Sequence, residues 1–228
     1  MIKQLKAAGS SERARNLSRF FKTAPGEYGA GDLFLGLTVP QIRAIVKDHA
    51  NLPLGEIKIL LASKYHEVRL AGAMFLVEQA RGADRQTKKQ LAEFYLKNLK
   101  RINNWDLVDL SAPTVVGEYL LIASAERKIL RKLSKEKNMW ARRVAMLATF
   151  PFIRGARFNE TLVLAERYLR DREDLMHKAT GWMLREVGKR DDAALKKFLA
   201  NHARIMPRTM LRYAIERLTP AERRYFMK

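Results

Sequence analysis

The spacing of apolar residues is the feature that most restricts how this chain can fold. Apolar side chains recur at steps of three and four residues along most of the sequence, as at Leu70, Met74 and Val77. This period places them on one face of a helix. No convincing alternation of apolar and polar residues and no Asn-Gly or Asp-Gly hairpin signal competes with it. The sequence therefore predicts an all-α fold.

A weak internal repeat is visible within this helical pattern. The segments that begin at Glu67, Ala141 and Met176 each carry a basic residue just before small and apolar positions, and Arg143 and Lys178 are 35 residues apart. Amphipathic helices are also predicted between these segments, at residues 54–63, 84–98, 124–134 and 159–169. Paired helices at this period predict an α-solenoid of HEAT-like helix pairs, a curved array with a basic concave face. A non-repetitive helical bundle is the alternative.

We expect residues 1–228 to form a single HEAT-like repeat domain. Residues 23–33 are predicted to be a long loop between an N-terminal helix and the array. The glycines of this loop do not make a dinucleotide-binding fingerprint, because the third glycine is missing and no strand precedes them. We therefore interpret the loop as a connection.

The chain is strongly basic, with 44 Lys and Arg against 24 Asp and Glu and a net charge of +20. Residues 127–157 hold ten basic residues and one acid, so the excess is clustered. Such clustering favours a binding surface for a polyanion, with nucleic acid as the first candidate. A generally basic, solvated surface is the alternative. An anionic membrane is disfavoured, because no basic amphipathic helix is flanked by interfacial Trp and Phe.

Several kinds of chemistry are disfavoured by composition. The chain has no cysteine, which excludes disulfides, thiolate metal sites and thiol nucleophiles. The four histidines are scattered without helical ligand spacing, so we expect neither a metal nor another cofactor. No apolar run is long enough for a secretion signal or a membrane span. We expect an intracellular, cytoplasmic protein that associates with the nucleoid through DNA and acts as a monomer.

The segment from Asn104 to Asp109 is the best candidate for a functional site. Trp105 and Asp109 are four residues apart, so on a helix they share one face. A carboxylate repels the phosphates that a basic surface attracts, which suggests that Asp109 has a role of its own. Asp106 is explained more simply, as an acidic residue that favours the positive end of the helix dipole.

A later helix carries a second candidate aromatic residue, Trp182. The functional interpretation places Trp105, Asp109 and Trp182 together on the concave wall, with Arg143 and Lys178 nearby. The alternative is that the tryptophans are core residues, as tryptophans often are. For Trp105 we favour function, because a core would not accept its carboxylate neighbour unpaired.

Four motifs resemble those of the DNA alkylation repair (AlkD-like) family of HEAT-repeat DNA glycosylases. In chain order they are Phe34–Leu37 with Pro40, Asn104–Asp109 with Pro113, Trp140–Arg143, and Gly181–Glu186. The similarity covers nearly the whole chain. It implies excision of N3- and N7-alkylated purines from double-stranded DNA by hydrolysis of the N-glycosidic bond, without full extrusion of the base.

The resemblance also implies roles for individual residues. Trp105, Asp109 and Trp182 correspond to the catalytic cleft, and Arg143 corresponds to a DNA contact. Periodicity adds further candidate DNA contacts at Arg142, Lys178, Arg185, Arg69 and Arg212. The sequence departs from some members at Asn104, where they have a second Trp, so we expect a thinner aromatic wall. It also has a longer loop at residues 23–32.

The residues suit this chemistry. Cleavage of a glycosidic bond builds positive charge on the sugar, and an ionised carboxylate such as Asp109 can stabilise that charge. No obvious general acid accompanies Asp109, but an alkylpurine with a formal positive charge needs none, because its base departs neutral. Two other functions remain open: a non-enzymatic HEAT protein that binds distorted or branched DNA, and a scaffold for an acidic protein partner.

Overall fold

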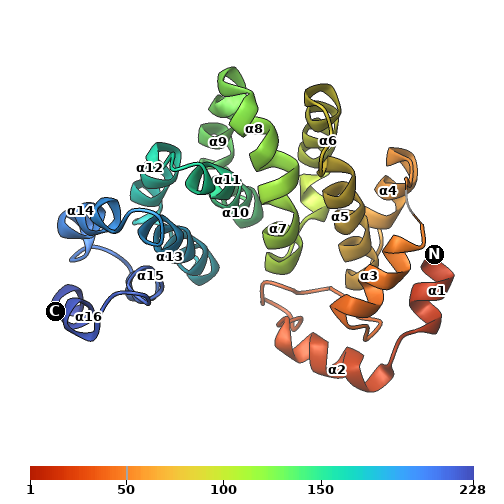
Figure 1. The fold of residues 1–228 in the computed structure, drawn as a ribbon. Coiled ribbons are helices and arrows are strands. Elements are labelled where there is room, and N and C mark those ends of the chain that lie inside the picture. Colours follow the sequence, from red (N-terminus) through yellow and green to blue (C-terminus); the bar gives the residue numbers. More distant parts are fainter. Residues whose placement is uncertain (50) are drawn as a thin grey trace. The chain divides into compact units, whose positions relative to one another are not determined.

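The computed structural model describes residues 1–49 and 51–228, which fold into a succession of short α-helices (Figure 1). Within these residues, extended pairing is limited to one parallel bridge between Leu33 and Tyr65. The prediction of an all-α chain is confirmed. The residues group into two compact units, Met1–Val116 and Gly117–Lys228. The expectation of a single repeat domain stays a prediction.

The first unit is organised around its longest helix. Its helices are α1 (Ile2–Ala7), α2 (Ser11–Phe20), α3 (Val39–Lys47), α4 (Leu54–Leu61), α5 (His66–Ala80), α6 (Arg85–Lys97) and α7 (Trp105–Ser111). Helix α5 is buried along nearly its whole length, and α3, α4, α6 and α7 all pack against it. An apolar sequence without a polar stripe is what such a central helix requires. Helix α5 therefore determines where α7 lies.

A carboxylate on α5 fixes the chain that precedes α3. The buried side chain of Glu67 accepts hydrogen bonds from the backbone N–H groups of Leu35, Gly36 and Leu37, at 2.9, 2.7 and 3.2 Å. Gly36 has φ of +83°, and a Cβ there would lie 2.0 Å from the carbonyl oxygen of Ser10. Only glycine fits this position. Segment 35–37 is thus held between α5 and the start of α2.

The second unit repeats this plan around α13. Its helices are α8 (Glu118–Ile122), α9 (Lys128–Leu133), α10 (Met139–Leu147), α11 (Phe150–Arg154), α12 (Asn159–Tyr168), α13 (Asp174–Gly188), α14 (Asp192–His202), α15 (Arg208–Ala214) and α16 (Pro220–Met227). Helices α10, α11, α12, α14 and α15 pack on α13. A Cβ at Gly181 would lie 2.4 Å from the carbonyl oxygen of Met210, so this glycine permits the close approach of α13 and α15.

The predicted helix pairs are present locally. Helices α4 and α5, α9 and α10, and α12 and α13 each pack against one another, and their positions match the predicted segments within a few residues. Helix α6 begins after Asp84, whose side chain accepts a hydrogen bond from the backbone N–H of Thr87 at 2.7 Å. Among the described residues, no helix is both long and apolar enough to cross a bilayer.

The hydrogen bonds of Glu67 lead to a stability prediction. Replacement of Glu67 by Gln puts an amide NH2 group in place of one carboxylate oxygen, against at least one backbone N–H donor. We therefore expect the free energy of unfolding to fall by about 2 to 4 kcal/mol. Urea denaturation measures the change. Glu78→Gln, at an exposed position of the same helix, is the matched control and should change stability by less than about 1 kcal/mol. Equal effects in the two variants would contradict this role of Glu67.

Candidate functional site

The local sequence around α7 explains both of its ends. Asn104 is fully buried and its side-chain oxygen accepts a hydrogen bond from the backbone N–H of Trp105 at 2.8 Å, so it caps the helix. Pro113 has no N–H with which to continue α-helical bonding to the carbonyl of Asp109. The chain instead forms a π-helix at Ala112–Gly117. π-Helical segments are rare in proteins, and those that occur are often found at functional sites.

Trp105 lies in a stack of aromatic rings that comes from three separate parts of the first unit. Its ring is parallel to that of Phe21 at 5.2 Å and meets Phe20 edge-on at 6.0 Å. Phe21 in turn stacks on Phe34 at 5.0 Å, and both of these rings contact the imidazole of His66. The indole is half-buried. Its orientation is therefore fixed by the end of α2 and by the loop that follows.

Beneath this aromatic stack lies a buried group of charged side chains. His66, with 1% of its surface exposed, has Nδ1 3.0 Å from Asp32 and Nε2 2.8 Å from Asp106. The guanidinium of Arg69 donates to the other oxygen of Asp32 at 2.7 Å. Asn104 also donates to Asp32, at 3.4 Å. We call Asp32, His66, Arg69 and Asp106 the ionic cluster.

The ionic cluster is electrically balanced when His66 carries a proton. Burial alone would lower the pKa of His66, but its hydrogen bonds with Asp106 and Asp32 raise that pKa to about 9. Burial opposes the ionisation of Asp32, yet the hydrogen bond from His66 and the charge of Arg69 keep the pKa of Asp32 below its usual value. Two carboxylates thus face two cations. The cluster joins the residue 23–33 loop, α5 and the start of α7.

Asp109 is half-buried on α7, one turn after Trp105. It lies close enough to Tyr95 for its charge to matter: burial, together with the negative charge of Asp109, raises the pKa of Tyr95. The Tyr95 hydroxyl and the Ser111 hydroxyl are 3.0 Å apart, a hydrogen bond that joins α6 to α7. The carboxylate therefore lies on a helix that is fixed at both ends, near enough to Tyr95 to act on its hydroxyl through charge.

Trp182 belongs to the other compact unit, on α13. Its indole N–H donates to Glu186 at 3.2 Å, and its ring lies 6.2 Å from that of Phe150. Like Trp105 it is half-buried, unlike Trp140, which is part of the core. The Trp105–Asp109 pair and Trp182 thus belong to different units, and the cleft predicted from all three residues stays a prediction.

Most of the predicted DNA-binding residues already have partners inside the protein. Arg69 and Arg143 are each 4% exposed, and their guanidinium groups donate to the backbone carbonyls of Ser63 and Leu175. These two residues consequently support the fold in this conformation, and they are not presented to a ligand.

The other predicted contacts lie nearer the surface. Arg142 forms an ion pair with Asp171 at 2.7 Å, and Lys178 pairs with Asp174 at 2.8 Å. Arg185 pairs with Glu216. Arg212 is exposed and lines a shallow hollow of about 360 Å³. The lining residues of this hollow are Arg212, Ile215, Glu216, Arg223, Arg224 and Met227. Arg212 is therefore the most accessible of the six predicted contacts.

Three features of the site were not anticipated. Asp106 is more than a helix-start residue, because one oxygen accepts from the backbone of Leu107 while the other accepts from His66. Asn104 is a buried helix cap, and the thinner aromatic wall expected there stays a prediction. The aromatic neighbours of Trp105 are Phe20 and Phe21. No periodic signal marks these residues, since they come from a helix end and a loop.

Comparison with known proteins identifies the family of the chain. The family model described as DNA alkylation repair enzyme matches residues 1–218. The chain therefore belongs to the DNA alkylation repair enzyme family. A solved structure described as a predicted DNA alkylation repair enzyme from Enterococcus faecalis is 16% identical, with a TM-score of 0.74, and the match covers 93% of this chain and 97% of that one. At that identity the likeness shows the fold. No curated protein matches the chain.

The raised pKa of His66 predicts how stability depends on pH. The pKa of His66 is about 9 in the folded protein and 6.5 ordinarily. Protonated His66 therefore stabilises the folded state fully below pH 6.5, and this stabilisation is lost as pH rises through about 9. A shift of this size corresponds to about 3 kcal/mol. We expect the stability difference between wild type and His66→Gln to narrow by roughly that amount between pH 6 and pH 10.

Urea unfolding at several pH values measures this difference. His49→Gln, in the turn after α3 and outside the ionic cluster, serves as the control, and its stability should follow that of the wild type across the pH range. The groups that face His66 are Asp32, Asp106 and Arg69. If the difference in unfolding free energy between wild type and His66→Gln stays constant from pH 6 to pH 10, His66 is not charged in the folded protein.

Proposed function

We propose that this protein is a DNA glycosylase that removes cationic N3- and N7-alkylated purines from double-stranded DNA. Family membership shows a role in the repair of alkylated DNA. The glycosylase assignment rests on one observation above all: Trp105 and Asp109 share a face of α7, both half-buried, on a helix held rigidly by a cap, an aromatic stack and the ionic cluster.

The proposed reaction is hydrolysis of the bond between C1′ of the sugar and the purine nitrogen. As this bond breaks, its electron pair goes to the base, which loses its formal positive charge and departs neutral, while positive charge develops on the sugar. The Asp109 carboxylate stabilises that charge and orients a water molecule toward C1′. The water oxygen bonds to C1′ and its proton is released to solvent.

The aromatic side chains have a separate role in the proposal. The faces of Trp105 and Trp182 stabilise the cationic base or sugar by cation–π attraction. The stacking of Trp105 on Phe21 supports this assignment, because a preorganised ring loses little freedom when it meets a ligand. The other carboxylate of α7, Asp106, is already bound to His66 and to the backbone of Leu107, in keeping with a substrate that needs no general acid.

Contact with DNA is proposed to depend mainly on the phosphate backbone. The net charge of +20 favours that mode, and it predicts affinity that falls with salt and varies little with sequence. Arg212 is the best supported of the predicted contacts, since it is exposed beside Arg223 and Arg224. For Arg143 and Arg69, burial supports a positioning role beneath the DNA-facing surface.

A non-enzymatic DNA-binding protein is the second candidate. The observation that favours it is the engagement of Trp105 with Phe20 and Phe21, which gives this tryptophan a packing role that needs no substrate. Under this alternative the protein binds distorted or branched DNA through its backbone and releases no base. The two functions differ in what an Asp109 variant does.

The decisive experiment compares base release by wild type and Asp109→Asn. We expect the wild type to release 7-methylguanine or 3-methyladenine from methylated duplex DNA, and Asp109→Asn to be slower by about 100-fold or more. The variant should bind duplex DNA at least as well, because a repulsive charge is lost. Base release is measured by chromatography and duplex binding by fluorescence anisotropy.

Asp48→Asn removes one negative charge from an exposed position at the end of α3 and is the matched control. It should release bases at the wild-type rate. Unchanged excision by Asp109→Asn would refute the role of Asp109. Absence of release by the wild type, with salt-sensitive duplex binding intact, would favour the non-enzymatic candidate.

A further inference from the structure

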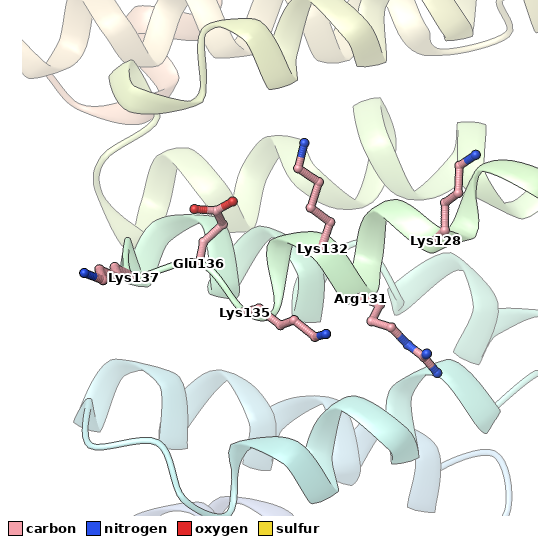
Figure 2. Close-up of a pocket in the computed structure, with 6 residues that line it drawn as sticks. All are labelled: Lys128, Arg131, Lys132, Lys135, Glu136 and Lys137. Carbon is pink, nitrogen blue, oxygen red and sulfur yellow. The ribbon is translucent and has the colours of Figure 1, made fainter.

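The strongest unassigned feature is a stripe of cations on α9 and the turn that follows it. Lys128, Arg131 and Lys132 on α9, and Lys135 in the turn after it, recur at steps of three and four residues, so their backbone positions form one row from which the side chains spread in two directions. Lys137 continues the stripe. Figure 2 shows Lys128 and Lys132 pointing to one side and Arg131 and Lys135 to the other, along the length of α9.

These five cations line a shallow hollow of about 640 Å³, with Glu136 as its one acid. All five are exposed. Within residues 1–49 and 51–228, none of them forms an ion pair with a carboxylate. Neighbouring cations in the same unit behave differently: Arg127 pairs with Glu160, and Arg142 pairs with Asp171. We call these five cations the α9 stripe.

The fold of the second unit does not need the α9 stripe. Leu130 and Leu133 supply the buried side of α9, which packs on α10. Like charges three and four residues apart destabilise a helix by a few tenths of a kcal/mol per pair. The helix dipole offsets this cost for Arg131 and Lys132 in the last turn, but not for Lys128 at the start. The stripe therefore costs stability that an external anion would recover.

We propose that the α9 stripe, which the second unit alone supplies, is a binding surface for the phosphate backbone of duplex DNA. Among polyanions, the choice of DNA rests on the proposed function. Helix α9 rises about 8 Å from Lys128 to Leu133, and Lys135 and Lys137 extend the row of cations beyond its end. This length is sufficient to contact about three phosphates of a duplex, which carries one negative charge per about 1.7 Å of its axis. The stripe thus adds affinity for DNA without sequence preference. Phosphate binding also gives a role to cations that form no ion pair within the protein.

The test compares two variants with equal charge change. In the stripe variant Lys128, Arg131, Lys132 and Lys135 are each replaced by Gln. In the control variant the same substitution is made at the exposed residues Arg43, Lys47, Lys58 and Lys97 of the first unit. Binding to an unmodified 20-base-pair duplex is followed by fluorescence anisotropy from 50 to 300 mM NaCl, and circular dichroism verifies that both variants are folded.

We expect the stripe variant to bind at least tenfold more weakly at 100 mM NaCl. Its slope of log affinity against log salt should be shallower by about 2 to 3 units, the value for three lost phosphate contacts. The control variant should lose clearly less affinity and retain most of the slope. Equal losses in both variants, or no loss in the stripe variant, would overturn the proposal and assign binding to net charge or to another surface.

Failure of this inference can be told apart from failure of the proposed function. Duplex binding is measured on undamaged DNA, so it does not depend on base release. A wild type that releases no base but shows the stripe-dependent salt slope would refute the glycosylase assignment and retain the α9 surface. Stripe-dependent binding to phosphatidylserine–phosphatidylcholine vesicles, without stripe-dependent duplex binding, would overturn the choice of DNA.

Discussion

The paired charges of Asp32, His66, Arg69 and Asp106 are the constraint on which the candidate site depends. A loop, the central helix α5 and the first turn of α7 meet at these four side chains, none of which is adjacent to another in sequence. A buried imidazolium between two carboxylates tolerates little displacement, because each broken contact would leave a charge uncompensated in the interior. The position of Trp105, directly before Asp106, follows from this arrangement, and the aromatic stack of Phe21 and Phe34 closes over it.

The cations of this protein divide into those that hold the fold and those that are offered to solvent. Arg69, Arg143 and Arg142 belong to the first kind, because each is buried or paired. The α9 stripe and Arg212 belong to the second kind. Electrostatic attraction of DNA depends on the second kind, while the first shapes the helices that carry the candidate site. The count of 44 Lys and Arg thus overstates the number of cations available for binding, and five of those available lie together on the α9 stripe.

Periodicity was sufficient to predict the helices and much of their pairing, because helices with a buried apolar side keep a strict three- and four-residue spacing in sequence. The Trp105–Asp109 face was predictable for the same reason. The ionic cluster was not, since Asp32 and His66 are 34 residues apart and His66 and Asp106 are 40 apart, with no repeat relating them. The ion pair of Arg142 with Asp171 was equally hidden, because the two residues are 29 apart in sequence. The pair of Lys178 with Asp174 has four-residue helical spacing, which a charge count alone does not use.

His66 and Glu67 are consecutive residues of α5, yet they hold two different points of the same segment. His66 binds Asp32, and Glu67 binds the backbone of residues 35–37. Leu33 and Phe34 span the interval between these two anchors, so an insertion or deletion there would release one of them. The preceding stretch from Thr23 to Gly31 has no such double attachment. Among relatives, insertions and deletions should accordingly occur before Asp32 and be absent between Asp32 and residue 37.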